Sequence, residues 1–595
     1  MRAWLSDTID DGLTFLSGER GRRWLIRAAP GPIGGLALVV LCVALYLPGT
    51  FVMPAVDRDE ARFAQASRQM FESAALPEDQ QTESLHSGGW IVPRIGERDR
   101  LNKPPLIYWL QVGSAAAFTG GDPSRDAIWM YRIPSALFAT LAVLFTWRIG
   151  VSMFDPRAGL LAAALLAACP LVLWDAHQAR ADQLLLACTT GAMWGLWSTV
   201  RSTQRRWVGP ILTAAAIGLG ILAKGPITPM IVLLTALVLL MTRRWRFLLR
   251  ARPITSLAVI AVLIAPWAYI ATQRVGFDTL LASLTDETLG RATEAKENHG
   301  GPPGYHVFML PLMLWPGVLL TGAALVRGWH RARPFSSIKS SDGRGRLAET
   351  FCLAWIIPSW IVFEAVTTKL PHYTMPLYPA LALLTARGVF AAADDALPGI
   401  RGAAAGIGYW LWVILGVAVL VVAPIGVSIL GGGWIVIGIT VAVALAARYL
   451  LHRARRELMS SFFLRAQLWS IAAFVVGAIA LVGVALPRAS SLWITTSIMN
   501  TIEAIDPDRA RPLAAIDFHE DSLVFASRAQ VVKLDMQDLR SWMRANPNGL
   551  VVIPRERLAE LDPVSGPRLN PLDTASGFNY SSGRLVDLVI AEIEP

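Results

Sequence analysis

Long apolar segments dominate this chain, and they limit the folds open to it more than any other feature. A helix needs roughly 17–25 mostly apolar residues to cross a lipid bilayer. Of the 595 residues, 54% are hydrophobic and only 16% are charged, whereas soluble domains carry about 25% charged residues. The sequence therefore predicts an all-α polytopic membrane protein. Thirteen segments qualify as crossings, at residues 34–54, 132–153, 157–175, 182–200, 207–223, 226–242, 254–272, 306–326, 350–367, 373–392, 404–430, 433–450 and 467–487.

Basic clusters between these segments predict the orientation, because short cytoplasmic loops carry an excess of Lys and Arg. With all the clusters in the cytoplasm, the N-terminus lies inside and the C-terminus outside. Because successive crossings must run in opposite directions, this orientation requires that a shorter apolar piece at 105–119 does not cross the membrane. Runs of about 10–14 apolar residues are more often re-entrant or interfacial, so we predict a juxtamembrane helix there. The clusters lie at 20–27, 201–206, 243–252, 327–346 and 448–456.

Three regions follow from this pattern. Residues 1–33 form a cytoplasmic segment, 34–490 form the membrane domain, and 491–595 form a small domain outside. The membrane domain exposes two long outer loops, at 55–131 and 273–305. In the last region, short alternating stretches near 513–518, 530–534 and 549–554 flank a helical pattern at 536–545, which predicts an α/β domain. The four cysteines all lie in apolar segments and are interpreted as packing residues: Cys42, Cys169, Cys188 and Cys352.

Acidic residues gather where the first crossing ends. Asp57, Asp59 and Glu60 precede a helical pattern, and an acid at a helix start can simply be a cap. Three acids beside the membrane are costly to desolvate, however, which favours a functional site. A carboxylate there can act as a general base or orient an acceptor. We therefore predict Asp59 and Glu60 as catalytic residues.

Cations and a phenol accompany these acids in the outer loops. Lys103, before two prolines, suits a phosphate beside the lipid headgroups, although a snorkelling lysine is the alternative. Lys369 and Tyr373 open a later crossing and suit an anionic headgroup. His299 could be a metal ligand, an acid–base group or a plain loop residue. No Gly-rich phosphate loop or dinucleotide fingerprint occurs, so a donor that arrives through the membrane fits better than a soluble nucleotide-sugar.

Taken together, these residues resemble the polyprenyl-phosphate-sugar glycosyltransferases of families 39 and 83, and most closely the aminoarabinose-to-lipid A transferases. The resemblance covers most of residues 34–595 and implies the GT-C fold, with about thirteen transmembrane helices plus juxtamembrane helices. The matching stretches are Asp59-Glu60-x-Arg62-Phe63-Ala64, Trp90-Ile-Val-Pro93, Lys103-Pro-Pro-Leu-Ile-Tyr-Trp109, Asp182, Lys224-Gly225-Pro226, His299 and Lys369-Leu-Pro-His372-Tyr373.

The resemblance also implies roles for individual residues. Asp59 is similar to the family's catalytic carboxylate, with Asp182 as a second acid near the same cavity. In the aminoarabinose transferases a Glu before the Lys can share a metal ion with the loop His. Asn102 stands at that position here, which argues against the one candidate cofactor, a divalent metal ion at His299. The predicted substrate-binding residues are Lys103, Arg62, Lys224, Lys369, His372, Tyr373 and His299.

The implied function is transfer of a sugar from a polyprenyl (undecaprenyl) phosphate donor to lipid A or another envelope glycolipid, by inverting displacement. The site would face the periplasm from the bacterial inner membrane, in a monomer surrounded by membrane lipids. The net charge of +10 comes mostly from the cytoplasmic loops, so we expect no nucleic-acid partner. Two alternatives remain: a protein O-mannosyltransferase, and a transporter of lipid-linked sugars. Transporters often contain inverted repeats, and none is evident here.

Overall fold

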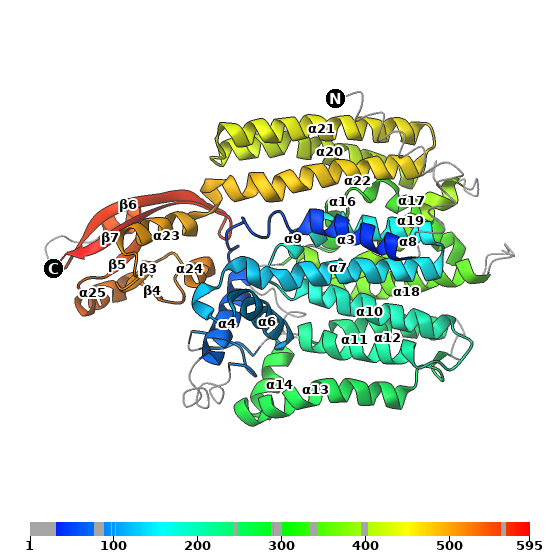
Figure 1. Ribbon diagram of the computed structural model, residues 1–595, viewed down its shortest axis with the longest axis horizontal. Helices are drawn as coiled ribbons and strands as arrows, with labels where there is room; N and C mark the ends of the chain where they lie inside the picture. The colour runs from blue at the N-terminus through cyan, green and yellow to red at the C-terminus, as the bar shows by residue number, and fades with distance from the viewer. Residues whose placement is uncertain are drawn as a thin grey trace.

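A bundle of roughly parallel helices forms the membrane domain (Figure 1). The computed structural model describes residues 31–75, 89–96, 98–101, 103–241, 247–286, 290, 300–332, 343–393, 403–560 and 567–594. Every predicted crossing overlaps one helix or two successive helices. These are α3 (Pro32–Tyr46), α7 (Ile128–Met153), α8 (Pro156–Ala167), α9 (Pro170–Ala176), α10 (Asp182–Arg201), α11 (Val208–Lys224), α12 (Ile227–Met241), α13 (Pro253–Val275), α16 (Tyr305–Met313), α17 (Val318–Ala332), α18 (Gly343–Ala365), α19 (Tyr378–Ala393), α20 (Ala403–Ile429), α21 (Gly433–Met459) and α22 (Phe463–Ala480).

Length and composition identify the helices that can cross a bilayer alone. Among the described residues, six helices qualify: α7, α13, most of α18, α20, α21, and α22 with its continuation to Arg488. The pair α8 and α9, bent by 59°, makes up to a seventh. Helices α3, α11 and α12 are apolar but shorter, and α10 is buried inside the bundle. The chain is thus a multi-pass membrane protein, while the count of thirteen crossings stays a prediction.

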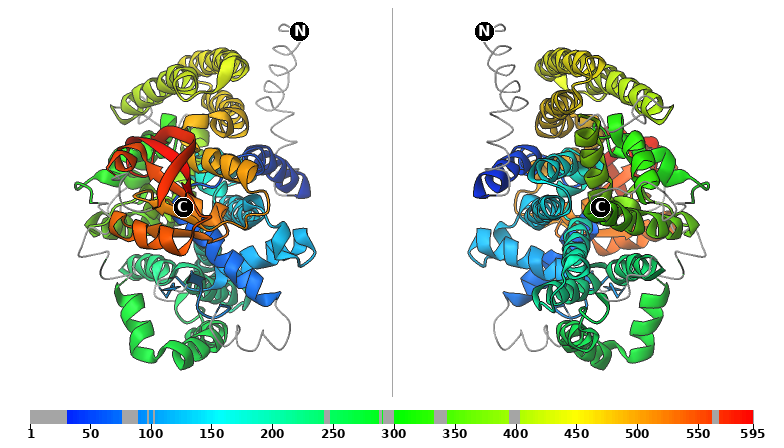
Figure 2. Two further views of the ribbon diagram at one scale, coloured as in Figure 1. Left: turned by 90° about the vertical axis from the view of Figure 1, so that its left-hand side faces the viewer. Right: turned by 90° about the vertical axis from the view of Figure 1, so that its right-hand side faces the viewer.

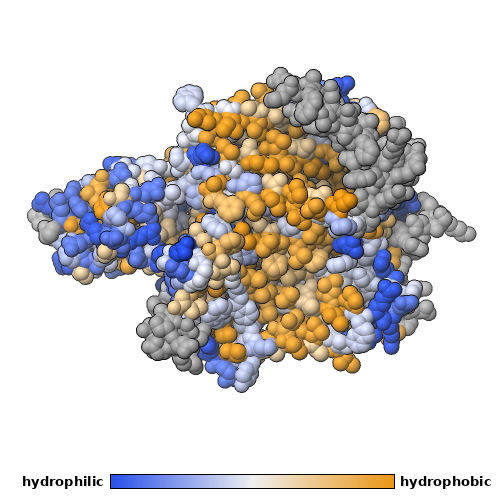
Figure 3. All heavy atoms as spheres, in the orientation of Figure 1, coloured by the Kyte–Doolittle hydropathy of each residue, from blue (hydrophilic) through white to orange (hydrophobic). Residues whose placement is uncertain are grey.

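The surface of the bundle separates into an apolar belt and two polar ends (Figure 3). The basic ends of α10, α17 and α21 and the basic start of α13 all lie at the right-hand end in Figure 1. Seen along the bundle, α20 and α21 lie at one edge and α13 at the opposite edge (Figure 2). A belt of this kind faces lipid, while basic ends suit the cytoplasmic side.

Short helices gather at the other end of the bundle. They are α4 (Asp59–Ala74), α6 (Leu106–Thr119) and α14 (Phe277–Thr285), together with the hairpin β1 (Arg94–Ile95) and β2 (Arg98–Asp99). Figure 1 shows α4 and α6 beside the C-terminal domain. Helix α6 corresponds to the apolar piece at 105–119 that is predicted not to cross the membrane. Its 14 residues are too few for a full span.

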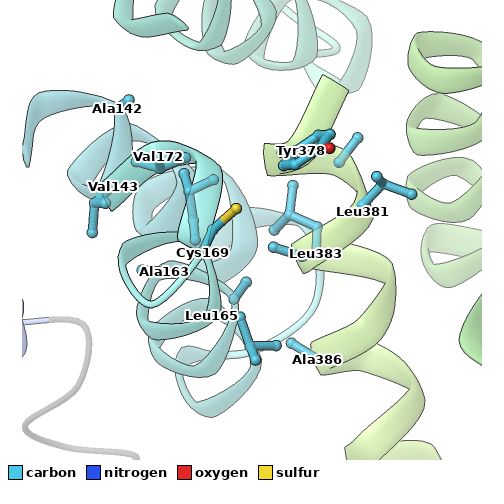
Figure 4. Packing of buried hydrophobic residues seen from close by; sticks show 14 of the residues in the cluster. Ala142, Val143, Ala163, Leu165, Cys169, Val172, Tyr378, Leu381, Leu383 and Ala386 are labelled. Atoms are coloured by element: carbon cyan, nitrogen blue, oxygen red, sulfur yellow. The ribbon is translucent and has the colours of Figure 1, made fainter. Parts of the chain in front are cut away.

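Close packing holds the bundle together. In Figure 4, residues of α7, α8 and α9 pack against α19, with Cys169 beside Leu383 and Tyr378. All four cysteines are free and buried, which agrees with the packing role expected for them. Gly150 of α7 and Gly159 of α8 meet so closely that a Cβ on Gly150 would lie 2.6 Å from the Gly159 Cα. Such small-residue contacts are typical of membrane helices.

The C-terminal region forms the predicted α/β domain. Its sheet has the order β4-β3-β5-β7-β6, in which β3, β4 and β5 are parallel and β6 and β7 form an antiparallel hairpin. The predicted strands and helix match β3 (Leu513–Ile516), β4 (Val531–Leu534), β5 (Leu550–Pro554) and α25 (Met536–Ala545). The unpredicted elements are α23 (Ile494–Ile505), α24 (Asp521–Ala526), α26 (Arg555–Ala559), β6 (Arg568–Asn579) and β7 (Arg584–Glu594).

This domain is docked on α4 by charged contacts. The Arg62 Nε lies 2.6 Å from an Asp521 carboxylate oxygen. Arg68 of α4 donates a hydrogen bond to the Phe525 carbonyl of the domain, and its guanidinium lies 3.8 Å from the centre of the Phe525 ring. The buried Asp126, which precedes α7, holds Arg68 in this position at 2.6 Å. The docking fixes α4, and therefore the acids at its start, against the domain.

Glu520 is a buried carboxyl group near this interface. Burial raises its pKa to about 7, and the neighbouring Asp57 adds to the effect. Its carboxylate accepts hydrogen bonds from Ser522 at 2.9 Å and Thr495 at 3.1 Å. Since the folded protein binds this proton more tightly than the unfolded chain, the contribution to stability is full below about pH 4.5 and is lost as the pH rises to about 7.

We therefore expect Glu520→Gln to weaken the pH dependence of stability. The wild-type melting temperature should fall between pH 5 and pH 8 by more than that of the variant. Thermal unfolding of the two purified proteins in the same detergent, at both pH values, measures the difference. An equal fall in both proteins would show that Glu520 does not titrate in this range.

Candidate active site

The loop that leads into α4 is anchored by Glu60. Its carboxylate accepts hydrogen bonds from Arg132 Nε at 2.7 Å and Arg132 Nη2 at 2.8 Å. It also accepts from the backbone N–H groups of Val56 at 2.7 Å and Ala179 at 2.8 Å. Both charged side chains are fully buried. The sequence predicted a catalytic role for Glu60, but a carboxylate with four donors already on it is suited to holding the fold.

The C-terminal domain clamps the same loop from the other side. The hydroxyl group of Tyr580 accepts a hydrogen bond from the Asp57 N–H at 2.7 Å, and Arg58 Nε donates to the Ser581 hydroxyl at 2.7 Å. Arg58 has a φ of 64°, a conformation that costs free energy for a residue other than Gly. These contacts hold the strained residue that directly precedes Asp59.

Arg180 joins the acids of the site. Its Nη2 lies 3.1 Å from an Asp59 carboxylate oxygen and 3.4 Å from Asp182 Oδ2. Lys224 donates to the other Asp182 oxygen at 2.5 Å, and the His372 Nε2 lies 3.8 Å from that same oxygen. Residues from α4, the α9–α10 turn, α10, α11 and the segment before α19 therefore meet at one point. The sequence predicted roles in the site for Asp59, Asp182, Lys224 and His372; the fold places the four close together, and their roles stay predictions.

A large cavity opens from this cluster. Its volume is about 1490 Å³. The polar end contains the cluster just described together with Arg100 and Lys103, and Tyr580 of the C-terminal domain lines it as well. The remaining wall is apolar and is formed by α20, α21 and α22 together with residues of α9, α12, α16 and α18. The cavity therefore offers charge at one end and a long hydrocarbon-like surface at the other.

The predicted binding residues fall into three groups: those that line the cavity, Lys369, which is not among the lining residues, and His299, which lies outside the described residues. Lys103, Lys224, His372 and Tyr373 line the cavity, as does Arg62, which is also ion-paired with the C-terminal domain. Lys369 is not among the lining residues: its side chain is buried and its ammonium donates to the Val366 carbonyl at 3.0 Å, which argues against that prediction. His299 lies outside the described residues, as does Asn102.

The electrostatics of Asp59 differ from those of an ordinary general base. Its side chain is 46% exposed, on the cavity side. Burial alone would raise the pKa of Asp59, but Arg180, His372, Lys103 and Arg100 together hold it well below its usual range. Asp59 is thus a stable carboxylate, which makes it a weak proton acceptor and a good partner for positive charge.

Sequence reasoning missed Arg180, Asp175, Arg132 and Arg100. Arg180 stands between two apolar segments, where a charged residue needs a partner, so its position was a usable signal. Arg132 lies inside an apolar run, and only the fold reveals that Glu60 is its partner. Within the described residues, no group of three or more His, Cys, Asp or Glu side chains could hold a metal ion.

Comparisons with known proteins show which families and structures this chain is similar to. The family model for dolichyl-phosphate-mannose-protein mannosyltransferases matches residues 102–270. The undecaprenyl phosphate-alpha-4-amino-4-deoxy-L-arabinose arabinosyl transferase of Edwardsiella ictaluri is 27% identical over 479 residues, which cover 76% of this chain and 77% of that protein. The enzyme of the same name from Pseudomonas aeruginosa is 27% identical over 330 residues, 55% of this chain and 54% of the relative.

Solved structures extend the likeness to nearly the whole chain. ArnT from Cupriavidus metallidurans bound to undecaprenyl phosphate superposes with a TM-score of 0.70 at 18% identity, covering 94% of this chain and 98% of that one. Its apo state gives a TM-score of 0.65, covering 94% and 97%. The predicted GT-C fold and the resemblance to the aminoarabinose transferases are confirmed.

Proposed function

We propose that this chain, a GT-C fold protein similar to the aminoarabinose transferases, is a glycosyltransferase of the bacterial inner membrane. It transfers a sugar from undecaprenyl phosphate, or a related polyprenyl phosphate, to lipid A or another envelope glycolipid. The site faces the periplasm, opposite the basic ends of the helices. The enzyme acts as a monomer, without a nucleic-acid partner.

The observation that carries this proposal is the two-sided character of the cavity. Carboxylates and cations converge at one end, while the wall formed by α20, α21 and α22 is apolar. A polyprenyl-phosphate-linked sugar has the same division, with a charged phosphate and a polar sugar at one end of a long hydrocarbon chain. A soluble nucleotide-sugar would leave the apolar wall uncovered.

The residues at the polar end suit a direct displacement. An acceptor oxygen forms a bond to the anomeric carbon while the bond from that carbon to the phosphate oxygen breaks. The electron pair leaves with the polyprenyl phosphate, and the configuration at the carbon inverts. Lys103 and Arg100 stabilise the charge that builds on the departing phosphate. Asp59 stabilises the positive charge that develops at the sugar ring.

The charge state of Asp59 supports an acceptor that is already ionised. A carboxylate whose pKa is held below its usual range is a poor base for a sugar or protein hydroxyl. A lipid A phosphate needs no deprotonation. Protein O-mannosylation, the activity named by the family model over residues 102–270, requires a hydroxyl acceptor and is the second candidate.

Donor binding can be tested with two lysines that the sequence alone does not distinguish. We expect Lys103→Met to raise the Kd for undecaprenyl phosphate by about 10-fold or more, because a charge-assisted contact with the phosphate is lost. Lys369→Met should leave the Kd unchanged, since its ammonium lies outside the cavity. Binding of radiolabelled undecaprenyl phosphate to the purified variants measures both values. Equal losses in the two variants would contradict the assignment.

The acceptor can be identified in the cell. Mass spectrometry of lipid A and of outer-face proteins, from the parent strain and a deletion strain, should show a sugar lost from lipid A or another glycolipid. Restoration by the wild-type gene, and not by a gene encoding Asp59→Asn, ties the change to this site. Loss of hexose from exported proteins with unchanged lipids would favour the mannosyltransferase instead.

A further inference from the structure

Asp175 is a carboxylate for which the mechanism above gives no use. It lies near the end of α9 and forms part of the cavity lining, yet the residue is only 1% exposed. Neither of its carboxylate oxygens accepts a hydrogen bond of normal geometry among the described residues, although Arg180 and the Gln183 side chain lie close to it. A buried carboxylate that accepts no hydrogen bond costs free energy, so a second arrangement in which those oxygens are used would be favourable.

Arg180 is the group that can donate hydrogen bonds to the Asp175 oxygens. Its Nη1 lies 3.7 Å from an Asp175 oxygen, just beyond hydrogen-bonding distance. The Arg180 Nε is also buried without a partner. One guanidinium thus faces three carboxylates, on Asp59, Asp182 and Asp175, and in its present position it leaves the third unsatisfied.

We propose that Arg180 moves from Asp59 onto Asp175 when substrate occupies the site, and that Asp175 is therefore a positioning residue for catalysis. A small shift would give Arg180 and Asp175 a close pair of charge-assisted hydrogen bonds. Asp182 would keep its 2.5 Å contact with Lys224. Asp59 would lose its 3.1 Å contact with Arg180 and be free to face the sugar. This inference rests on the proposed transferase function.

A double-mutant cycle separates this role from a structural one. Asp175→Asn should lower kcat by about 10- to 100-fold, the size expected when a reacting group is misplaced, with little change in the Kd for undecaprenyl phosphate. In an Arg180→Gln background, Asp175→Asn should have no further effect on kcat, because the guanidinium that would bind Asp175 has been removed. Asp175→Glu should recover part of the rate. The matched control is Asp155→Asn, at the far end of the same bent pair, where Asn also serves as a cap.

The outcomes distinguish the inference from the function on which it rests. Additive effects in the cycle, or a wild-type kcat in Asp175→Asn, would overturn the positioning role while leaving the transferase intact. Absence of any transfer by the wild-type protein would refute both. If Asp175→Asn does not fold, a structure of the wild type with donor bound decides. Arg180 within hydrogen-bonding distance of Asp175 supports the inference, and Arg180 still on Asp59 overturns it.

Discussion

Replacing Asp59 by Asn is expected to lower the transfer rate by about 10²-fold or more without loss of folded protein. The Asn side chain keeps the size of Asp59 but removes the negative charge that stabilises the sugar in the transition state, and such losses typically cost about 10²–10³-fold. Because the buried Arg180 beside Asp59 keeps its contact with Asp182, the change leaves no buried charge unpaired. Transfer from a purified lipid-linked donor, at matched protein concentration in detergent, measures the effect.

The control for this variant is again Asp155→Asn, which changes an acid outside the cavity. Its rate should equal that of the wild type. Both variants should elute from a sizing column like the wild type and melt at a similar temperature. Undiminished transfer by Asp59→Asn, in a protein that passes these checks, would remove Asp59 from the mechanism.

Replacing Glu60, the next residue, is expected to destabilise the fold instead of slowing transfer by a folded protein. Glu60→Gln leaves Arg132 buried with an uncompensated charge, and breaking a buried ion pair in this manner typically costs about 3–5 kcal/mol. The variant should therefore melt at a much lower temperature or fail to insert, so that activity is lost together with folded protein. Melting temperature and yield of monodisperse protein are the measurements.

A companion variant sharpens this comparison. Arg132→Met, which removes the cation from the same pair, should destabilise the protein to a similar degree, because it leaves the Glu60 carboxylate as the buried unpaired charge. A folded Glu60→Gln protein with normal melting but no transfer would restore the catalytic role that the sequence predicted for Glu60. The adjacent acids thus provide their own test of which one reacts and which one supports.

Much of the fold was accessible from the sequence because its signals are local. Apolar run length marks the helices, and strand–helix alternation marks β3, β4, β5 and α25. Charge pattern places Asp59, Lys103 and Asp182 at one end of the bundle. The β6–β7 hairpin was missed because polar and apolar residues alternate only weakly within it. Its contribution to the site through Tyr580 depends on how the domain docks on the membrane domain, which no local sequence pattern reveals.

The two site predictions that the fold argues against, those for Glu60 and Lys369, have a common physical cause. Residue type and spacing show that a charge lies near the membrane, but they do not show which partner neutralises it. In the sequence, Glu60 looks equivalent to Asp59, and Lys369 looks equivalent to Lys103. Only the fold shows that Glu60 is paired with Arg132 and that Lys369 donates to the Val366 carbonyl. Arg180 was passed over for a related reason: Asp175 and Asp182 are its neighbours in the sequence, but Asp59 comes from α4 and meets it only in the fold.

Reconstitution of the purified protein in liposomes, with undecaprenyl-phosphate-linked aminoarabinose and lipid A, tests the central claim most directly. The amounts of sugar on lipid A and of free undecaprenyl phosphate should rise together, one for one, and Asp59→Asn should stop both. Passage of the intact donor across the bilayer, with no sugar transferred and no undecaprenyl phosphate released, would contradict a transferase and support a transporter.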